Sequence, residues 1–394
     1  MTWMIREDLL DPDQQDFIDN EINKSGNIWI KGFAGSGKSV LLVHALKKTL
    51  EKNPNAKVCV VVFTWSLVDL FKTGLHELGI RGNVPVLTYY ALERDTARYD
   101  YIFCDEVQDL PQKAIDVIKR KASKIIVAGD TNQSIYEMDP QWHQSVIEPD
   151  EIGELIEARP FNLNYIHRLT RSIIKALQKL IPGMNIWSAR RDLTKVDVQI
   201  RLCKASSVEQ EVQYIWKEAK KGPSIAGETS VILFPRHIYI VEFVQQLLEI
   251  NNKPRWEFKP SPYDRGKPID KAAPDYNDLN KFLKDQGLKI EYVGNSFGSL
   301  ENATLNHNVI IMTYYSVKGL DFDNVFVPFL NDDLHIPGKS ETLFMVAISR
   351  SRKNLYLSYT GYTHEYVDRF EDECNNIDID MTGSNKTNSL DFDF

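Results

Sequence analysis

The stretch Gly32-Phe33-Ala34-Gly35-Ser36-Gly37-Lys38-Ser39 decides the fold. It fits the pattern G-x-x-x-x-G-K-[ST], follows an apolar run at Ile28–Lys31 and opens a helical segment at Val40–Lys52. The glycines let successive backbone N–H groups face phosphate oxygens, and the helix N-terminus adds a favourable dipole. Lys38 is expected to reach the β- and γ-phosphates, and the Ser39 hydroxyl to bind Mg²⁺. The loop from Gly35 to Val40 therefore predicts a site for ATP and Mg²⁺.

Strand-like runs alternate with helix-like segments along the chain. Short β-branched or apolar runs of the kind buried in parallel sheets occur at Val58–Phe63, Tyr101–Cys104, Ile125–Ala128, Val198–Cys203, Val231–Phe234, Val309–Thr313, Val325–Phe329 and Leu355–Tyr359. Between two of them, Ser206 and Glu209 form a plausible capping box for a helix that runs to Lys221. Such alternation predicts an α/β protein with two mostly parallel sheets.

Length and charge define the parts of the chain. The 394 residues carry 47 Lys and Arg against 55 Asp and Glu, a net charge of −8. Residues 371–394 hold seven acids and one base, so six of the eight net negative charges lie there. We expect a first domain over residues 1–160, a second over 161–370 and an acidic disordered tail over 371–394. Residues 251–308, rich in proline at their start, are expected to form a loop or small insertion.

Cysteine use and hydropathy indicate the compartment. The four cysteines lack metal-ligand spacing and are expected to be reduced thiols, three of them buried in strands: Cys59, Cys104, Cys203 and Cys374. No apolar run approaches the roughly 18 residues that span a bilayer. We therefore expect a cytoplasmic protein without a membrane partner.

Two carboxylates follow the apolar run that ends at Cys104. At the end of a strand, Asp105 can hold Mg²⁺ through water, and Glu106 can orient and deprotonate an attacking water. An acid pair at a helix N-terminus is the alternative reading. Gln133 follows the run at Ile125–Ala128 and could sense the γ-phosphate, although a polar turn would have the same sequence. Together these residues predict hydrolysis of ATP rather than binding alone.

Further motifs stand in a characteristic order around these residues. They are Leu10–Gln14, Phe63-Thr64-Trp65, Leu87-Thr88-Tyr89, Asp105–Asp109, Gly129–Tyr136, Asn164–Thr170, Thr313–Phe322 and Val346–Arg350. With the phosphate loop, this series resembles the superfamily 1 helicases of the UvrD/Rep/PcrA type, from about Leu10 to Tyr359. The resemblance implies two tandem RecA-like P-loop motor domains that close on one nucleotide.

The resemblance also assigns roles at the nucleotide. It implies that Gln14, with Gln15 as the alternative, reads adenine, and that Tyr165 or His167 stacks on the base. It places Gly319 and Asp321 at the nucleotide. It makes Arg350 and Arg168 the arginine fingers of the second half. Arg171 competes for the role of Arg168, and compensation of a helix C-terminus is the alternative reading of Arg350.

Six residues are the candidates for contacts with a single strand. By resemblance or as aromatic rings on which bases can stack, they are Thr64, Trp65, Thr88, Tyr89, Tyr136 and Tyr315. Core packing is the competing interpretation for each aromatic ring. After Tyr136 the chain reads Glu-Met-Asp-Pro-Gln where the family usually has Arg-Trp-Arg-Gly-Ala, so the family's stacking tryptophan is missing. Trp142 is a candidate substitute.

The expected function is ATP-driven movement on a single strand. Only about sixteen residues, Tyr89–Cys104, separate two motifs between which relatives insert an accessory subdomain. We therefore expect a compact translocase or helicase that uses single-stranded DNA rather than RNA, in the 3′-to-5′ direction. The alternatives are an ATP-switched subunit of a partner complex and, less well supported, a metabolic P-loop kinase. The partner would be a nuclease, since none is encoded here, or a protein that docks the acidic and aromatic tail.

Overall fold

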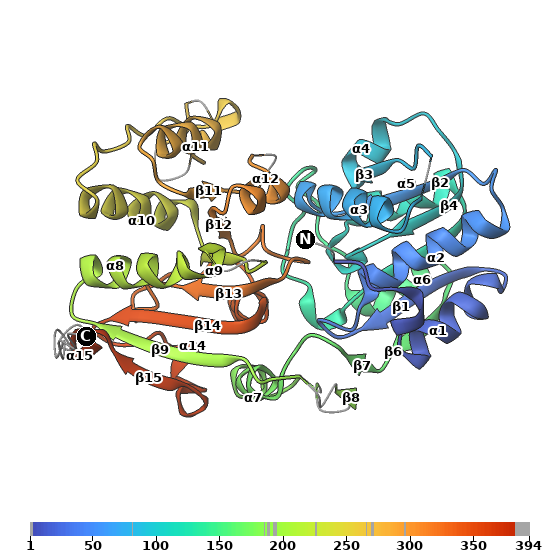
Figure 1. Ribbon diagram of the computed structural model, residues 1–394. Helices are drawn as coiled ribbons and strands as arrows, with labels where there is room; N and C mark the ends of the chain where they lie inside the picture. Colours follow the sequence, from blue (N-terminus) through green and yellow to red (C-terminus); the bar gives the residue numbers. More distant parts are fainter. Residues whose placement is uncertain are drawn as a thin grey trace, which may run out of the picture.

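The computed structural model describes residues 3–80, 82–184, 186, 190–191, 195–224, 227–264, 266–268, 272–294 and 297–382. These residues form two α/β lobes that lie side by side, the first coloured blue to green and the second green to red (Figure 1). Each lobe is built on one parallel sheet. The predicted fold class is therefore confirmed.

The first lobe has a six-stranded sheet in the order β3-β2-β4-β5-β1-β6. Its strands are β1 (Asn27–Gly32), β2 (Val58–Val62), β3 (Val86–Thr88), β4 (Tyr99–Cys104), β5 (Ala122–Gly129) and β6 (Ala158–Leu163). Its helices are α1 (Pro12–Asp19), α2 (Lys38–Lys52), α3 (Trp65–Glu77), α4 (Tyr89–Arg94), α5 (Gln112–Lys121) and α6 (Ile152–Leu155). Every strand pair is parallel, so the carboxyl ends of the strands share one edge.

Strand β2 of the first lobe is continuously apolar because both faces of the sheet are buried there. In β2, Val58, Val60 and Val62 pack into one core, whereas Cys59 and Val61 pack into the core on the opposite face. Successive side chains of a strand point to opposite faces, so only an uninterrupted apolar run can fill both cores.

The second lobe has a seven-stranded sheet in the order β11-β12-β10-β13-β14-β9-β15. Its strands are β9 (Gln199–Ala205), β10 (Ser230–Phe234), β11 (Ile290–Tyr292), β12 (Val309–Thr313), β13 (Phe322–Val327), β14 (Ser351–Thr360) and β15 (Asn375–Asp378). Its helices are α7 (Arg171–Leu180), α8 (Val208–Ala219), α9 (Lys221–Ser224), α10 (His237–Ile250), α11 (Tyr276–Asp285), α12 (Leu300–Leu305), α13 (Ser340–Ile348), α14 (Glu365–Asp368) and α15 (Ile379–Thr382). A small pair, β7 (Tyr165–Ile166) and β8 (Arg190–Arg191), lies between the lobes in sequence.

Two predicted boundaries differ from the structure. A division at residue 160 falls inside β6, which pairs with β1 through Leu163, so the first domain extends past the predicted limit. Residues 251–308 are not a mere loop or insertion, because they contain α11, the sheet strand β11 and α12. Proline-rich composition concealed these elements because only the first half of the segment is irregular.

The prediction of a disordered tail is wrong for residues 371–382. This segment forms a 3₁₀ turn at Glu371–Glu373, then β15, which pairs in parallel with β9, and then α15. Ile377 and Ile379 pack with Cys203 of β9, and Lys179 pairs with Asp372 at 2.5 Å and Glu373 at 2.8 Å. Acidic composition did not reveal backbone pairing and two apolar anchors. Residues 383–394, including the suggested docking peptide, lie outside the described residues.

Smaller predictions can also be compared with the structure. Ser207, one residue later than predicted, caps α8, and its hydroxyl accepts from Gln210 N at 3.2 Å. Cys59, Cys104 and Cys203 are buried free thiols as expected, and Cys374 is half-buried. Among the described residues, no helix combines the length and apolar character needed to cross a membrane.

Candidate functional site

Most of the residues predicted to bind nucleotide line one cleft between the two lobes, from which Gln14, Ser36 and Tyr165 are absent. The cleft has a volume of about 880 Å³. From the first lobe it is lined by the phosphate loop and Glu106, and from the second by Gly319, Asp321 and Arg350. The two sheets therefore contribute complementary groups to one space.

The phosphate loop has the backbone that its glycines predict. Gly35 and Gly37 have φ values of +74° and +80°, in the left-handed region that side chains disfavour. A Cβ at Gly35 would collide with Arg168, and one at Gly37 with the Gln14 amide. The Ser36 hydroxyl is buried without a hydrogen-bond partner among the described residues. This tight loop with an unsatisfied hydroxyl fits a bound phosphate group.

Lys38 begins α2 and bends back over the loop. Its ammonium donates to Gly32 O at 2.8 Å and to Phe33 O at 3.0 Å. Burial lowers the pKa of Lys38, and the nearby carboxylates of Asp130, Glu106 and Asp105 oppose that effect. A desolvated cation at this position is suited to bind an anion more strongly than these carbonyl groups.

Ser39 and Asp105 form the candidate Mg²⁺ site. The Ser39 hydroxyl donates to Asp105 Oδ2 at 2.5 Å, and Asp105 is buried at the end of β4. Burial and the neighbouring charge of Glu106 raise the pKa of Asp105. Mg²⁺ is commonly held by one or two protein oxygens together with phosphates and waters, so this pair of oxygens fits the ion.

Glu106 is held in an unusual backbone conformation beside Asp105. Its φ of +54° lies in the left-handed region, which is rare for a residue with a side chain. The Gln108 amide donates to Glu106 Oε2, and Gln108 Oε1 accepts from Asp130 N at 3.2 Å. Despite burial, Lys318 and Lys38 keep the pKa of Glu106 below its usual value. The carboxylate is therefore ionised and fixed, as a general base requires.

Lys318 is a site residue that sequence reasoning did not select. It lies between β12 and β13 of the second lobe and is almost completely buried. Its ammonium pairs with Asp109, donates to Gln133 O and lies 3.6 Å from Glu106 Oε2. Lys318 belongs to the motif Thr313–Phe322, but a local motif does not indicate a contact with Asp109, about 200 residues earlier in the chain.

Gln133 occupies the predicted strand end. It lies in the 3₁₀ turn Thr131–Gln133 after β5, is buried and lines the cleft with Lys38 and Glu106. Its backbone N–H donates to Asp130 O at 3.0 Å. The side chain is therefore located where it could contact a γ-phosphate or its attacking water.

Both predicted arginines reach the cleft. Arg168 pairs with Asp321, and its backbone N–H donates to Gly35 O at 3.2 Å. Arg350 donates from Nε to Val346 O at 2.7 Å and from Nη2 to Ser349 Oγ at 3.1 Å. Burial and the nearby Arg168 lower the pKa of Arg350 to about 9. Two clustered, buried cations in a cleft with a phosphate loop favour an anionic ligand.

The residues assigned to the base lie on the outer side of the phosphate loop. The Gln14 amide donates to Ser36 O at 3.2 Å and accepts from Asp11 N at 3.1 Å. His167 lines the cleft, and its Nε2 lies 2.5 Å from Asp11 Oδ2. The Tyr165 ring lies parallel to the His167 ring at 6.1 Å. The two rings that the sequence left as alternatives are thus neighbours, and His167 is the nearer to Gly37.

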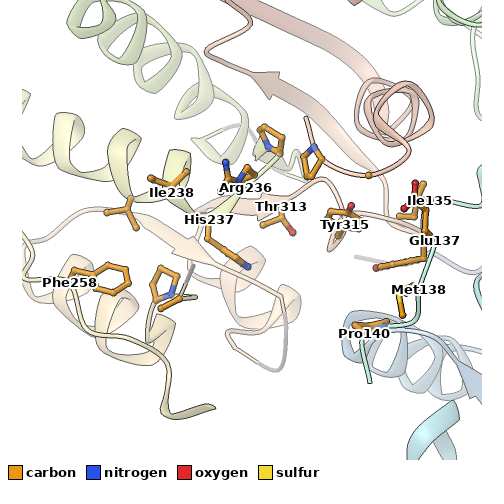
Figure 2. Close-up of a pocket in the computed structure, with 17 residues that line it drawn as sticks. Ile135, Glu137, Met138, Pro140, Arg236, His237, Ile238, Phe258, Thr313 and Tyr315 are labelled. Atoms are coloured by element: carbon orange, nitrogen blue, oxygen red, sulfur yellow. The ribbon is translucent and has the colours of Figure 1, made fainter. Parts of the chain in front are cut away.

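A second, larger groove also crosses both lobes. It measures about 1140 Å³, and Figure 2 shows Ile135, Glu137, Met138 and Pro140 on one side and Phe258 and Ile238 on the other. Two of the predicted strand-binding residues, Tyr136 and Tyr315, line it, with ring centroids 5.2 Å apart. Thr64 caps α3 outside this groove, and Trp65 is 44% exposed beside Tyr90.

Thr88 and Tyr89 are interior residues, in contrast to the prediction. Thr88 is fully buried as the cap of α4. Tyr89 stacks on Phe63 at 5.2 Å, and its hydroxyl donates to Asp139 Oδ2 at 2.9 Å. Core packing, the competing interpretation, therefore holds for Tyr89.

The departure after Tyr136 has a structural role. Asp139 is fully buried and accepts from the backbone N–H groups of Gln141, Trp142 and Gln144 at 2.8–3.0 Å. It thereby fixes a turn in which the Trp142 ring packs edge-on against Tyr89 and is covered by Lys113. Trp142 does not line the groove in this structure.

Family comparisons match the two lobes separately. Residues 28–164 match a model described as the viral superfamily 1 RNA helicase core domain, and residues 263–362 match the UvrD-like helicase C-terminal domain. No curated protein sequence matches the chain. Each lobe thus resembles the corresponding half of a two-lobed RecA-like core.

Three solved structures with detectable similarity are helicases of viruses. The PRRSV helicase is 15% identical with a TM-score of 0.41, covering 84% of this chain and 52% of its own. An arterivirus nonstructural protein 10 (helicase) in complex with DNA is 12% identical with a TM-score of 0.41, covering 91% and 65%. The same helicase in another crystal structure is 14% identical with a TM-score of 0.41, covering 92% and 64%. The chain thus spans about half to two thirds of these proteins.

Proposed function

We propose that this chain is a superfamily 1 helicase, a nucleic-acid-dependent ATPase that moves along single-stranded DNA in the 3′-to-5′ direction. One observation carries the proposal. The phosphate loop and Glu106 lie with Arg168 and Arg350 in one cleft between the two lobes, and Asp105 is bound to Ser39 of that loop. Hydrolysis at such a cleft changes the contacts between the two lobes, and a motor requires such a change in order to move one lobe relative to the other.

Each residue has a separate task in this proposal. Lys38 and the backbone N–H groups of the loop bind the phosphates, and Glu106 accepts the proton of the attacking water. Arg350 and Arg168 stabilise the charge that develops on the transferred phosphoryl group. Ser39 and Asp105 would hold Mg²⁺, which supplies charge neutralisation at the phosphates.

The strand would lie in the larger groove. Tyr136 comes from the loop that follows Gln133, and Tyr315 lies three residues before Lys318. Movements at the nucleotide are thus connected to the groove through short chain segments on both lobes. Aromatic walls grip bases without requiring a strongly basic protein.

ATPase measurements with and without nucleic acid test the proposal. Single-stranded DNA should raise the rate many-fold. Arg350→Ala should reduce the stimulated rate by roughly 10³-fold and Glu106→Gln by roughly 10²- to 10⁴-fold, while Lys38→Ala should abolish nucleotide use. Lys52→Ala, at the opposite end of α2 and exposed, is the matched control and should behave like the wild type.

The same assay separates the alternatives. Equal stimulation by RNA would remove the preference for DNA, and displacement of streptavidin from only the 3′ end of an oligonucleotide would contradict the direction. A basal rate that neither polymer changes would overturn the motor. An ATP-switched subunit of a complex is the second candidate, since Lys318 already engages Glu106 in this structure. Activity restored only by a protein partner would favour it.

A further inference from the structure

The larger groove has a wall that no motif contributes. Phe258, Ala272 and Pro274 line it from the segment between α10 and α11, beside Arg236 and His237 at the start of α10. Sequence reasoning set this segment aside as a loop. Figure 2 shows Phe258 and Ile238 facing the groove across from Met138 and Pro140.

This wall is firmly anchored to the second lobe. Trp256 is buried, its indole N–H donates to Asp278 Oδ2 at 2.9 Å, and its carbonyl accepts from Gln245 Nε2 at 2.6 Å. The Phe258 ring packs edge-on against Trp256 at 5.8 Å. Backbone hydrogen bonds from Ser261 N to Ala273 O and from Asp275 N to Lys259 O close the base of the segment. Phe258 is therefore presented on a fixed support.

His237 supplies a polar group within this otherwise apolar wall. Its Nδ1 lies 2.7 Å from the Tyr276 hydroxyl, and Tyr276 stacks in parallel on Tyr292. Burial lowers the pKa of His237 to about 4, so the ring is neutral near pH 7. Among the described residues, no group hydrogen-bonds to Nε2. When the phenol donates to Nδ1, Nε2 carries the ring proton and is a donor.

The composition of the groove indicates which part of a nucleic acid it takes. Of the described residues that line the groove, only Arg236 and Glu137 carry a charge, because His237 is neutral. Phosphates are bound mainly by clustered cations, which this wall does not provide. Apolar and aromatic faces with one fixed donor match an unpaired base, which has a flat face and acceptor atoms at its edge.

We propose that Phe258 and His237 form a base subsite on the second lobe, in which Phe258 contacts the face of an unpaired base and His237 Nε2–H donates to an acceptor at its edge. The subsite rests on the proposed function, because it needs a single strand in the groove. Tyr276 is a positioning residue, since its hydroxyl fixes the orientation and tautomer of the imidazole.

Fluorescence anisotropy with two oligonucleotides tests the subsite. The first is a thymidine tract and the second an abasic tract of equal length and charge. His237→Ala and Phe258→Ala should each weaken binding of the thymidine tract roughly tenfold and leave binding of the abasic tract unchanged. His237→Gln, which keeps a neutral donor, should retain most of the affinity, and Tyr276→Phe should lose part of it.

Controls distinguish the possible failures. Tyr362→Ala removes an aromatic ring that is 79% exposed and does not line the groove, and it should bind like the wild type. Thermal unfolding identifies variants that fail to fold, in which case Phe258→Leu replaces Phe258→Ala. Equal losses on both oligonucleotides, or none on either, would overturn the subsite while leaving the motor intact. A wild type that binds no single strand would instead overturn the proposed function.

Discussion

Individual buried charges fall into two groups. One group lines the nucleotide cleft and consists of Lys38, Glu106 and Arg350. Glu211 on α8 is different, because it is fully buried away from the cleft. Its Oε1 accepts from Phe329 N and Ser358 Oγ, both at 2.7 Å, and its Oε2 has no partner among the described residues. Ionisation of Glu211 therefore lowers the stability of the folded state.

This cost predicts a pH dependence of stability. Burial raises the pKa of Glu211 to about 7, above its ordinary value near 4.3. The folded state thus favours the neutral acid, and this contribution to stability is lost as the pH rises from about 4.3, the pKa in the unfolded chain, to about 7, the pKa in the folded protein. Urea denaturation of the wild type and Glu211→Gln should show a difference in unfolding free energy that grows in favour of Gln by about 1.4 kcal/mol per pH unit between about pH 4.3 and about pH 7, and that stays constant above about pH 7.

Glu209→Gln is the matched control, because Glu209 is exposed on the same helix. Its unfolding free energy should follow that of the wild type at every pH. A pH-independent difference between the wild type and Glu211→Gln would contradict a buried acid with a raised pKa.

At the level of elements, strands buried on both faces were predictable and the sheet edge was not. The apolar run at Val58–Phe63 matches β2 almost residue for residue, because every side chain of this strand is buried in one of two cores. Three of the four residues of β15, at Asn375–Asp378, are polar, and the strand is held by backbone pairing with β9. A local sequence pattern contains little information about such an edge strand.

Truncation tests how much β15 and α15 contribute to stability. Removing residues 371–394 exposes the edge of β9 and the apolar patch around Cys203, so it should lower the unfolding free energy by roughly 2–4 kcal/mol. Removing only residues 383–394 should leave it unchanged. Urea denaturation of the two truncated chains measures both effects, and equal stabilities would show that β15 does not support the fold.

For the whole molecule, residues within sequence motifs were predictable, whereas contacts between segments far apart in the chain were not. The phosphate loop, Glu106 and Arg350 were all identified from motifs, and the structure brings them to one cleft. The burial of Tyr89, the groove wall at Phe258 and the ion pair of Lys318 were not. Each depends on residues far apart in the chain, whose contact is set by packing rather than by spacing.

Lys318 connects the two lobes through a buried charge. It pairs with Asp109, which is itself fully buried, and burial raises the pKa of Asp109 to about 6 against the opposing charge of Lys318. A second link between segments far apart in sequence joins Arg168 to Asp321. Removing one member of a buried pair leaves an uncompensated charge, which costs more than the pair itself contributes.

A double-mutant cycle tests this link between the lobes. Lys318→Met should lower the unfolding free energy by roughly 3 kcal/mol and let the lobes separate, because Asp109 is left buried without its cation. Adding Asp109→Asn removes the stranded charge, so the double variant should regain most of the loss. Urea denaturation measures the energies, and small-angle X-ray scattering measures the separation. Strictly additive losses would mean that the two side chains do not hold the lobes together.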